Sequence, residues 1–167
     1  MKWLWVALLA TAAILGVITG IGVLLPQSHS VTRSSHFAQP PQAVWDVITG
    51  PPTWRPGIRS FENLPPRNGH RTWKEIDAHD NAVTYEAIEE TPPFRLITRI
   101  ADPNLPYGGL WIHEISLEPG GCVLQITEDG EIYNPIFRFM SRFVFGYTAT
   151  IDAAIQSLHA RLDQRGS

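Results

Sequence analysis

The residues best placed for chemistry are a histidine and a glutamate on either side of a glycine pair. Gly120-Gly121 predicts a two-residue hairpin turn, so the flanking strands are expected to pair directly. Counting outward from this turn places His113 opposite Glu128, on the same face as Leu117 opposite Leu124. Because that aliphatic pair indicates an inward face, we expect His113 and Glu128 to be neighbours on the inner side of a sheet.

Three roles are open to such a pair. A histidine beside a carboxylate in an apolar setting can act as a general base, with the carboxylate fixing its tautomer. The same pair can anchor a polar group of a ligand, or it can simply join two strands. The sequence favours the structural role, then ligand contact. No residue is assigned to catalysis, and His113 and Glu128 are the candidates for it.

Other catalytic and cofactor motifs are missing from the sequence. The six histidines show no HxH or HExxH spacing, and the single cysteine, Cys122, cannot form a multi-cysteine zinc site. No GxSxG, P-loop or GxGxxG segment is present. A net charge of −3 without a basic run argues against nucleic acid as a partner. We expect no metal and no cofactor.

The elements that position the pair follow from turn chemistry and apolar periodicity. A short helix is expected at 42–49, after Pro40-Pro41. Apolar residues then recur at spacings of three and four from Pro135 to about Asp163, which predicts one long helix. Strands are expected at 31–37, 58–64, 70–77, 82–89, 94–101, 110–118 and 122–132.

An open antiparallel sheet of about seven strands needs cover on one face, and the long C-terminal helix is the only element able to provide it. The N-terminal half of that helix is apolar almost all round, which a flat contact cannot satisfy. We therefore predict an α+β domain over residues 28–167, in which a curved sheet wraps around the helix and encloses a cavity.

The sequence resembles the SRPBCC superfamily over roughly residues 30–163. The segments that carry the resemblance are PQAVWDVI at 41–48, WRPGI at 54–58, TPPFRL at 91–96, EPGG at 118–121 and TEDGEIYNP at 127–135. The resemblance implies the helix-grip fold of START domains, birch-pollen allergens and polyketide cyclase/dehydrase-like proteins. It also implies a cavity for a hydrophobic small molecule or lipid. It does not imply a reaction, because fold does not fix function.

Aromatic side chains dominate the residues expected around this cavity. Trp73, Tyr85 and Trp111 also suit a plain core, whereas Trp54 lies in a loop at the expected entrance. The expected ligand contacts are Trp54, Trp73, Tyr85, Trp111, His113, Glu128, Phe139, Phe143 and Tyr147.

A long uncharged run precedes the domain. Residues 3–25 carry no charge, and as a helix they would reach roughly 35 Å, enough to cross a hydrocarbon core of about 30 Å. This length favours an uncleaved transmembrane anchor over residues 1–27. A cleaved secretory signal and a buried helix are the alternatives. Lys2 favours a cytoplasmic N-terminus and an extracytoplasmic domain.

These observations favour a membrane-anchored binding protein for a hydrophobic small molecule or lipid, rather than an enzyme. Two alternatives stay open: an aromatase/cyclase-like enzyme that uses His113 and Glu128, and a ligand-free interaction module whose cavity is filled by its own aromatic side chains. Only residues 26–30 separate the apolar run from the first expected strand, so a membrane-dissolved ligand is favoured over a water-soluble one. The sequence does not indicate an oligomeric state.

Overall fold

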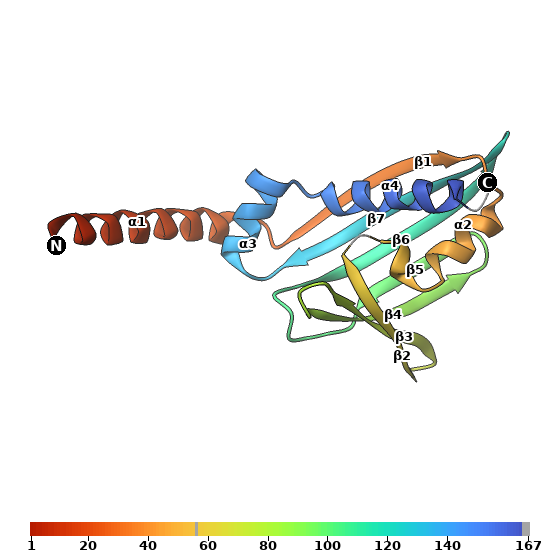
Figure 1. Cartoon of the computed structure of the whole chain (residues 1–167), viewed down its shortest axis with the longest axis horizontal. Coiled ribbons are helices and arrows are strands. Elements are labelled where there is room, and N and C mark those ends of the chain that lie inside the picture. The colour runs from red at the N-terminus through yellow and green to blue at the C-terminus, as the bar shows by residue number, and fades with distance from the viewer. Residues whose placement is uncertain (56, 165–167) are drawn as a thin grey trace.

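The computed structural model describes residues 1–55 and 57–164, and the expected order of elements is confirmed (Figure 1). Pro56 and residues 165–167, at the end of the expected domain, lie outside the described residues. The helical elements are α1 (Lys2–Leu24), α2 (Pro41–Ile48), η1 (Pro52–Trp54), α3 (Pro135–Met140), η2 (Ser141–Phe145) and α4 (Ala149–Asp163). The strands are β1 (Ser28–Phe37), β2 (Ile58–Arg67), β3 (His70–Asp77), β4 (Ala82–Thr91), β5 (Arg95–Ile100), β6 (Tyr107–Glu118) and β7 (Gly121–Ile132).

The strands form one antiparallel sheet in the order β1-β7-β6-β5-β4-β3-β2. The chain therefore returns from β7 to pair with the first strand, and α2 and η1 lie between β1 and β2. β1 begins at Ser28, three residues earlier than expected, because it pairs with β7 along its whole length from Ser28 opposite Glu131. This early start brings His29 into the sheet.

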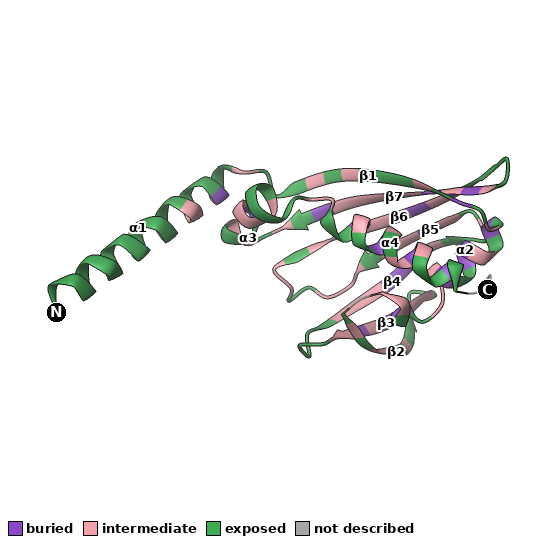
Figure 2. Ribbon diagram, turned by 45° about the horizontal axis from the view of Figure 1, so that its top comes forward, coloured by how far each residue is buried: buried purple, intermediate pink, exposed green. Residues whose placement is uncertain are grey.

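Helix α4 lies along one face of the curved sheet, beside α2 (Figures 1 and 2). Its side chains Ile151 and Leu158 are almost completely buried, as are Phe37 and Leu124 from the sheet. These residues belong to one core cluster, which fixes the distance between helix and sheet. The predicted helix-grip architecture is confirmed in this part of the molecule.

The prediction of one continuous C-terminal helix is wrong. Helix α3 ends at Met140, a π-helical turn covers Ser141–Phe145, and Gly146 then breaks the helix with φ 77° and ψ 153°. Residues with a Cβ atom rarely adopt this backbone conformation, so Gly146 permits a helix break that other residues would resist. The first half of the predicted helix therefore turns away from the sheet and packs against the end of α1.

The predicted register of the β6–β7 hairpin is also wrong. The strands close with Glu118 opposite Gly121, so His113 lies opposite Ile126 and Trp111 lies opposite Glu128. The register differs from the expected one by two residues, which preserves the inward face but separates His113 from direct pairing with Glu128.

Helix α1 projects away from the domain and is exposed over most of its length (Figure 2). It is long and apolar enough to cross a membrane, by length and composition, and a signal sequence near an N-terminus would have the same properties. Its last turn is fastened to α3. The backbone of Pro135 approaches Gly22 so closely that a Cβ there would collide with it. Arg138 donates a hydrogen bond of 3.0 Å to the carbonyl oxygen of Leu25.

Candidate functional site

A cavity of about 510 Å³ lies between the inner face of the sheet, α4 and the segment that joins β7 to α4. Leu96, Thr98 and Ile100 face into it from β5, as the period of two predicts. The residues proposed from the sequence that line it are Trp54, Trp73, Tyr85, Trp111, His113, Glu128 and Tyr147. The cavity is thus not filled by the protein's own aromatic side chains, which removes the basis of the ligand-free alternative.

Two of the proposed ligand contacts lie elsewhere. The rings of Phe139 and Phe143 contact each other at 4.9 Å between centroids, and neither residue lines the cavity. Phe143 is 59% exposed on the outside of the break between α3 and α4. Both positions were inferred from a continuous helix, so the break at Gly146 explains the difference.

One polar group of the cavity is built around a buried glutamate on β3. The Glu75 carboxylate accepts a hydrogen bond of 2.9 Å from the indole Nε1 of Trp73 and forms an ion pair with Arg55. Glu75 is buried, whereas Arg55 is partly exposed in the loop after η1. The pair neutralises a charge that would be costly to bury alone.

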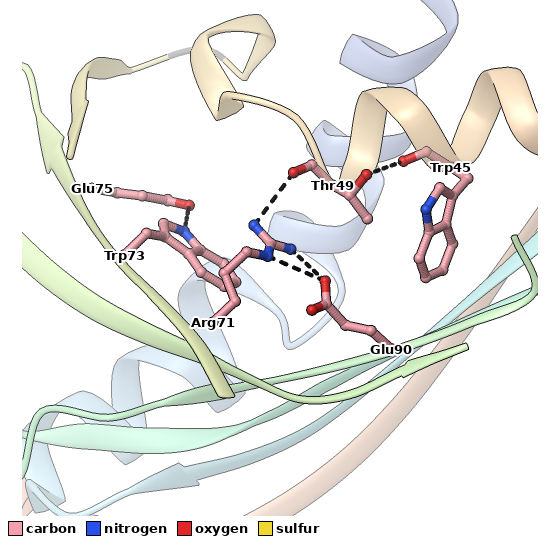
Figure 3. A network of polar contacts seen from close by, with 6 residues as sticks. All are labelled: Trp45, Thr49, Arg71, Trp73, Glu75 and Glu90. Carbon is pink, nitrogen blue, oxygen red and sulfur yellow. Dashed lines mark hydrogen bonds and ion pairs between the residues drawn. The ribbon is translucent and has the colours of Figure 1, made fainter. Parts of the chain in front are cut away.

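A second arginine, Arg71, contacts the end of α2, a neighbouring strand and the Trp73 ring of the cavity wall (Figure 3). Arg71 on β3 donates to the backbone carbonyl of Thr49 at 3.3 Å and to Glu90 on β4 at 2.8 Å, and its guanidinium lies 4.7 Å from the Trp73 ring centroid. Thr49 follows the last turn of α2, where a positive charge is favourable for the helix dipole. Arg71 thus joins α2 to the sheet and fixes the Trp73 ring in the wall.

His113 is a second buried ionisable group of the cavity wall. Burial lowers its pKa to about 4, and the positive charge of Arg55 acts in the same direction, while a hydrogen bond with the Leu96 backbone opposes them. Burial raises the pKa of Tyr85, with the charge of Glu75 acting in the same sense. Near neutral pH both groups are therefore uncharged and can exchange hydrogen bonds with an occupant.

A second polar group lies where β1 and β7 meet the helix break. His29 Nε2 is 3.5 Å from Glu128 Oε1, and the His29 ring stacks on Tyr147 with centroids 4.2 Å apart. Gly130 makes room for the imidazole, because a Cβ there would collide with the His29 ring. Burial lowers the pKa of His29, opposed by the charge of Asp129. Burial raises the pKa of Glu128, opposed by a hydrogen bond from Trp111.

Three polar atoms of the cavity lining have no hydrogen-bond partner among the described residues: Trp54 Nε1, His113 Nδ1 and Glu128 Oε2. Leaving such an atom buried and unpaired costs about 1–3 kcal/mol. An occupant with hydrogen-bonding groups can satisfy these atoms. In the part of the chain that the structure describes, no cluster of histidine, cysteine or acidic side chains is arranged to hold a metal ion.

His29, Arg55 and Glu75 line the cavity but were not among the residues expected from the sequence. Glu75 could have been predicted, because it lies two residues after Trp73 and therefore on the same face of the strand. His29 was missed because the first strand was expected to begin at Val31. Arg55 lies in a loop, and no periodicity indicates where a loop side chain points.

No protein-family model matches the chain, and no curated protein matches it. Solved structures do match in fold. A START superfamily protein from Mycobacterium smegmatis aligns with a TM-score of 0.64 at 15% identity, over 81% of this chain and 98% of that one. A norcoclaurine synthase from Thalictrum aligns with a TM-score of 0.62 at 10% identity, over 84% and 97%.

The di-domain aromatase/cyclase StfQ of steffimycin biosynthesis aligns with a TM-score of 0.65 at 11% identity. The match covers 84% of this chain and 52% of StfQ. These similarities show that the domain has the helix-grip fold of START and polyketide cyclase-like proteins. At these identities the likeness concerns the fold and leaves the chemistry to the residues of the site.

Proposed function

We propose that the chain is a membrane-anchored binding protein for a hydrophobic small molecule or lipid with hydrogen-bonding groups. The observation that carries this proposal is the cavity of about 510 Å³, lined by aromatic side chains and by buried polar atoms without partners. Its volume is in the range of small-molecule sites, and its chemistry suits an apolar body with a few polar groups.

The affinity would come from removing the apolar body of the ligand from water, worth about 25 cal/mol per Å² of area buried. The polar groups would set orientation. One end of the ligand would meet His113 and the Arg55–Glu75 pair, and the other would meet His29 and Glu128. Partners for the unpaired atoms add specificity, since a ligand lacking the matching groups would leave them unsatisfied.

The membrane part of the proposal is supported by α1, which is apolar, largely exposed and fastened to the domain by Arg138. An exposed helix of this composition needs an apolar surrounding, which a bilayer supplies. Lys2 supports a cytoplasmic N-terminus and an extracytoplasmic domain.

The test is native mass spectrometry of the full chain released from lipid nanodiscs. We expect the wild type to retain one apolar molecule. Thr98→Phe, which fills the cavity from β5, should lose it. Thr127→Phe is the matched control, because Thr127 bonds Thr32 on the outer face and should leave occupancy unchanged. An empty wild-type chain, or equal retention by both variants, would refute cavity binding.

The same spectra test the anchor. An uncleaved anchor leaves α1 in the mass of the mature chain, whereas a processed signal sequence gives a chain shortened by about its length. A shortened chain that still retains its apolar molecule would reject the anchor and keep the binding function.

A further inference from the structure

The exposed apolar surface of the domain is concentrated beside α1. Nine exposed large apolar residues are described after α1. Six of them lie between β7 and Gly146, and the other three, Phe94, Tyr107 and Leu117, are scattered over the strands and turns of the sheet. We define these six as the collar: Tyr133, Ile136, Phe137, Phe143, Val144 and Phe145. Single exposed apolar residues are ordinary on a protein surface, but a contiguous group marks an interaction site.

The collar continues the surface of the proposed membrane helix. α3 packs on the last turn of α1, and Arg138 fastens the two by donating to the carbonyl oxygens of Leu25 and Tyr133 at 3.0 and 3.1 Å. Figures 1 and 2 show α3 at the base of α1, between that helix and the sheet. A bilayer that encloses α1 would therefore meet the collar at its surface.

The charge of this segment fits the same partner. The sequence has no acidic residue between Glu131 and Asp152, while Arg142 is exposed between the collar phenylalanines. Aromatic side chains and arginine are the residues that favour the boundary between lipid headgroups and acyl chains. Protein interfaces share this composition, so the choice of a bilayer as the partner rests on the packing of α3 against α1.

The cavity reaches the collar. Phe137 and Phe145 belong to the collar and also line the cavity, together with Met140 and Ser141. The π-helical turn and the positive φ of Gly146 form the break at which exposed residues of the collar also line the cavity. Tyr147 and its stacking partner His29 follow directly inside, so a polar group that enters meets the His29–Glu128 pair first.

We infer that the collar is seated in the headgroup region of the bilayer and forms the opening through which the ligand passes directly between membrane and cavity. This inference rests on the proposed anchor and binding function, and it adds the route and the surface that provides it. An occupant that moves this way must be soluble in the bilayer, which selects amphiphilic lipids or membrane-dissolved apolar molecules as the ligand class.

Depth-dependent quenching tests where the collar lies. The full chain, with Cys122→Ala, carries one cysteine labelled with an environment-sensitive fluorophore, in phosphatidylcholine vesicles that contain nitroxide-labelled lipids. Val144→Cys reports on the collar, Ile14→Cys on the middle of α1, and Leu117→Cys on the exposed far end of β6. We expect strong quenching at 14 and 144 and none at 117.

The outcomes separate this inference from the proposed function. Quenching at position 14 without quenching at position 144 would show that α1 is in the bilayer but the collar is not. This result overturns the inference and leaves the proposed anchor intact. No quenching at 14 overturns the anchor, and the inference falls with it. A third outcome is a blue shift of the fluorophore at position 144 that grows with the protein-to-lipid ratio, without quenching by the nitroxide lipids. It would show that a second copy of the chain covers the collar, which also overturns the inference.

Exchange kinetics test the route. The variant Phe143→Ser/Val144→Ser changes two collar residues that do not line the cavity, so equilibrium binding should be unchanged. The probe is cis-parinaric acid added to the vesicles. It is read by energy transfer from the four tryptophans that remain in a Trp3→Phe/Trp5→Phe background, Trp45, Trp54, Trp73 and Trp111. We expect several-fold slower uptake at equal final occupancy, with Leu117→Ser at the wild-type rate. Equal rates for all three overturn the route.

Discussion

The two halves of the C-terminal apolar stretch carry similar residues in different surroundings. In α4, Ile151 and Leu158 are sealed against the sheet at 0% and 1% exposure. Between α3 and Gly146, Val144 and Phe145 are 57% and 64% exposed beside the end of α1. The comparison teaches that apolar periodicity indicates a surface that avoids water, but not whether protein or lipid covers it.

The largest expected difference between the halves is in stability. Ile151→Ala removes a buried side chain from the core and should lower the free energy of unfolding by about 2–5 kcal/mol. Ile136→Ala makes the same change in α3 at a partly exposed position, so we expect a loss below about 1 kcal/mol. Urea unfolding in a mild detergent, followed by tryptophan fluorescence, measures both. Equal losses would mean that both halves belong to one core.

Much of the fold was predictable because its breaks have strong chemical signals. Pro and Gly clusters marked the turns, and β3 was located at its observed bounds, 70–77. The hairpin register was not predictable from Gly120-Gly121 alone. Gly121 is outside the turn and is a glycine because the Phe37 carbonyl of β1 approaches it closely. A contact from a strand some 80 residues earlier thus produced a sequence pattern that resembles a turn.

The candidate site was predictable where residues share a strand face and unpredictable where the chain turns. Trp111 and His113 line the cavity, as alternation along the hairpin strand predicts, and Trp73 and Tyr85 line it from two further strands. Phe143 does not, because a single residue, Gly146, decides whether the helix continues. Helix propensity assigns such a glycine a cost of about 1 kcal/mol, too small to predict a break against a continuous apolar pattern.

Burial of His113 in the cavity wall should make the stability of the fold depend on pH. Unfolded histidine binds a proton below about pH 6.5, whereas folded His113 binds one only near its lowered pKa of about 4. Between these values the unfolded state holds more protons, so stability falls as pH falls. At 1.36 kcal/mol per pKa unit, His113 accounts for a loss on the order of 3 kcal/mol across this window. Urea unfolding at several pH values measures the slope.

His113→Gln removes this group and should flatten the slope between pH 4 and 6.5 relative to wild type. The matched control, His79→Gln, changes an exposed histidine in the β3–β4 turn and should keep the wild-type slope. A wild-type slope in His113→Gln would place the imidazole in contact with water, contrary to its burial.

The break between the halves can be tested at Gly146. An alanine there meets no atom within 4 Å, so its effect is a backbone effect alone. At φ 77° and ψ 153° we expect a loss of about 1–3 kcal/mol in unfolding free energy. Gly16→Ala is the control, since Gly16 lies in helix α1 with equal free space and should not destabilise the chain. A stabilised Gly146→Ala would indicate that α3 and α4 can join into one helix.

The smallest effect is expected where the exposed half meets α1. Arg138 is buried, and its guanidinium holds the Leu25 and Tyr133 carbonyls. Arg138→Met keeps the length of the side chain but loses both bonds, worth about 1–2 kcal/mol in local stability. We expect faster amide hydrogen exchange in residues 22–28, with little change in α4, because the α4 core does not depend on this contact.

Arg142→Met is the matched control, because Arg142 is exposed on the next turn and should leave the exchange pattern unchanged. Faster exchange spreading through α4 in Arg138→Met would mean that the two halves unfold as one unit. Exchange confined to the junction would instead show that the collar and α1 form a separate unit of stability. Such a unit would move relative to the sheet while the core that shapes the cavity stays folded.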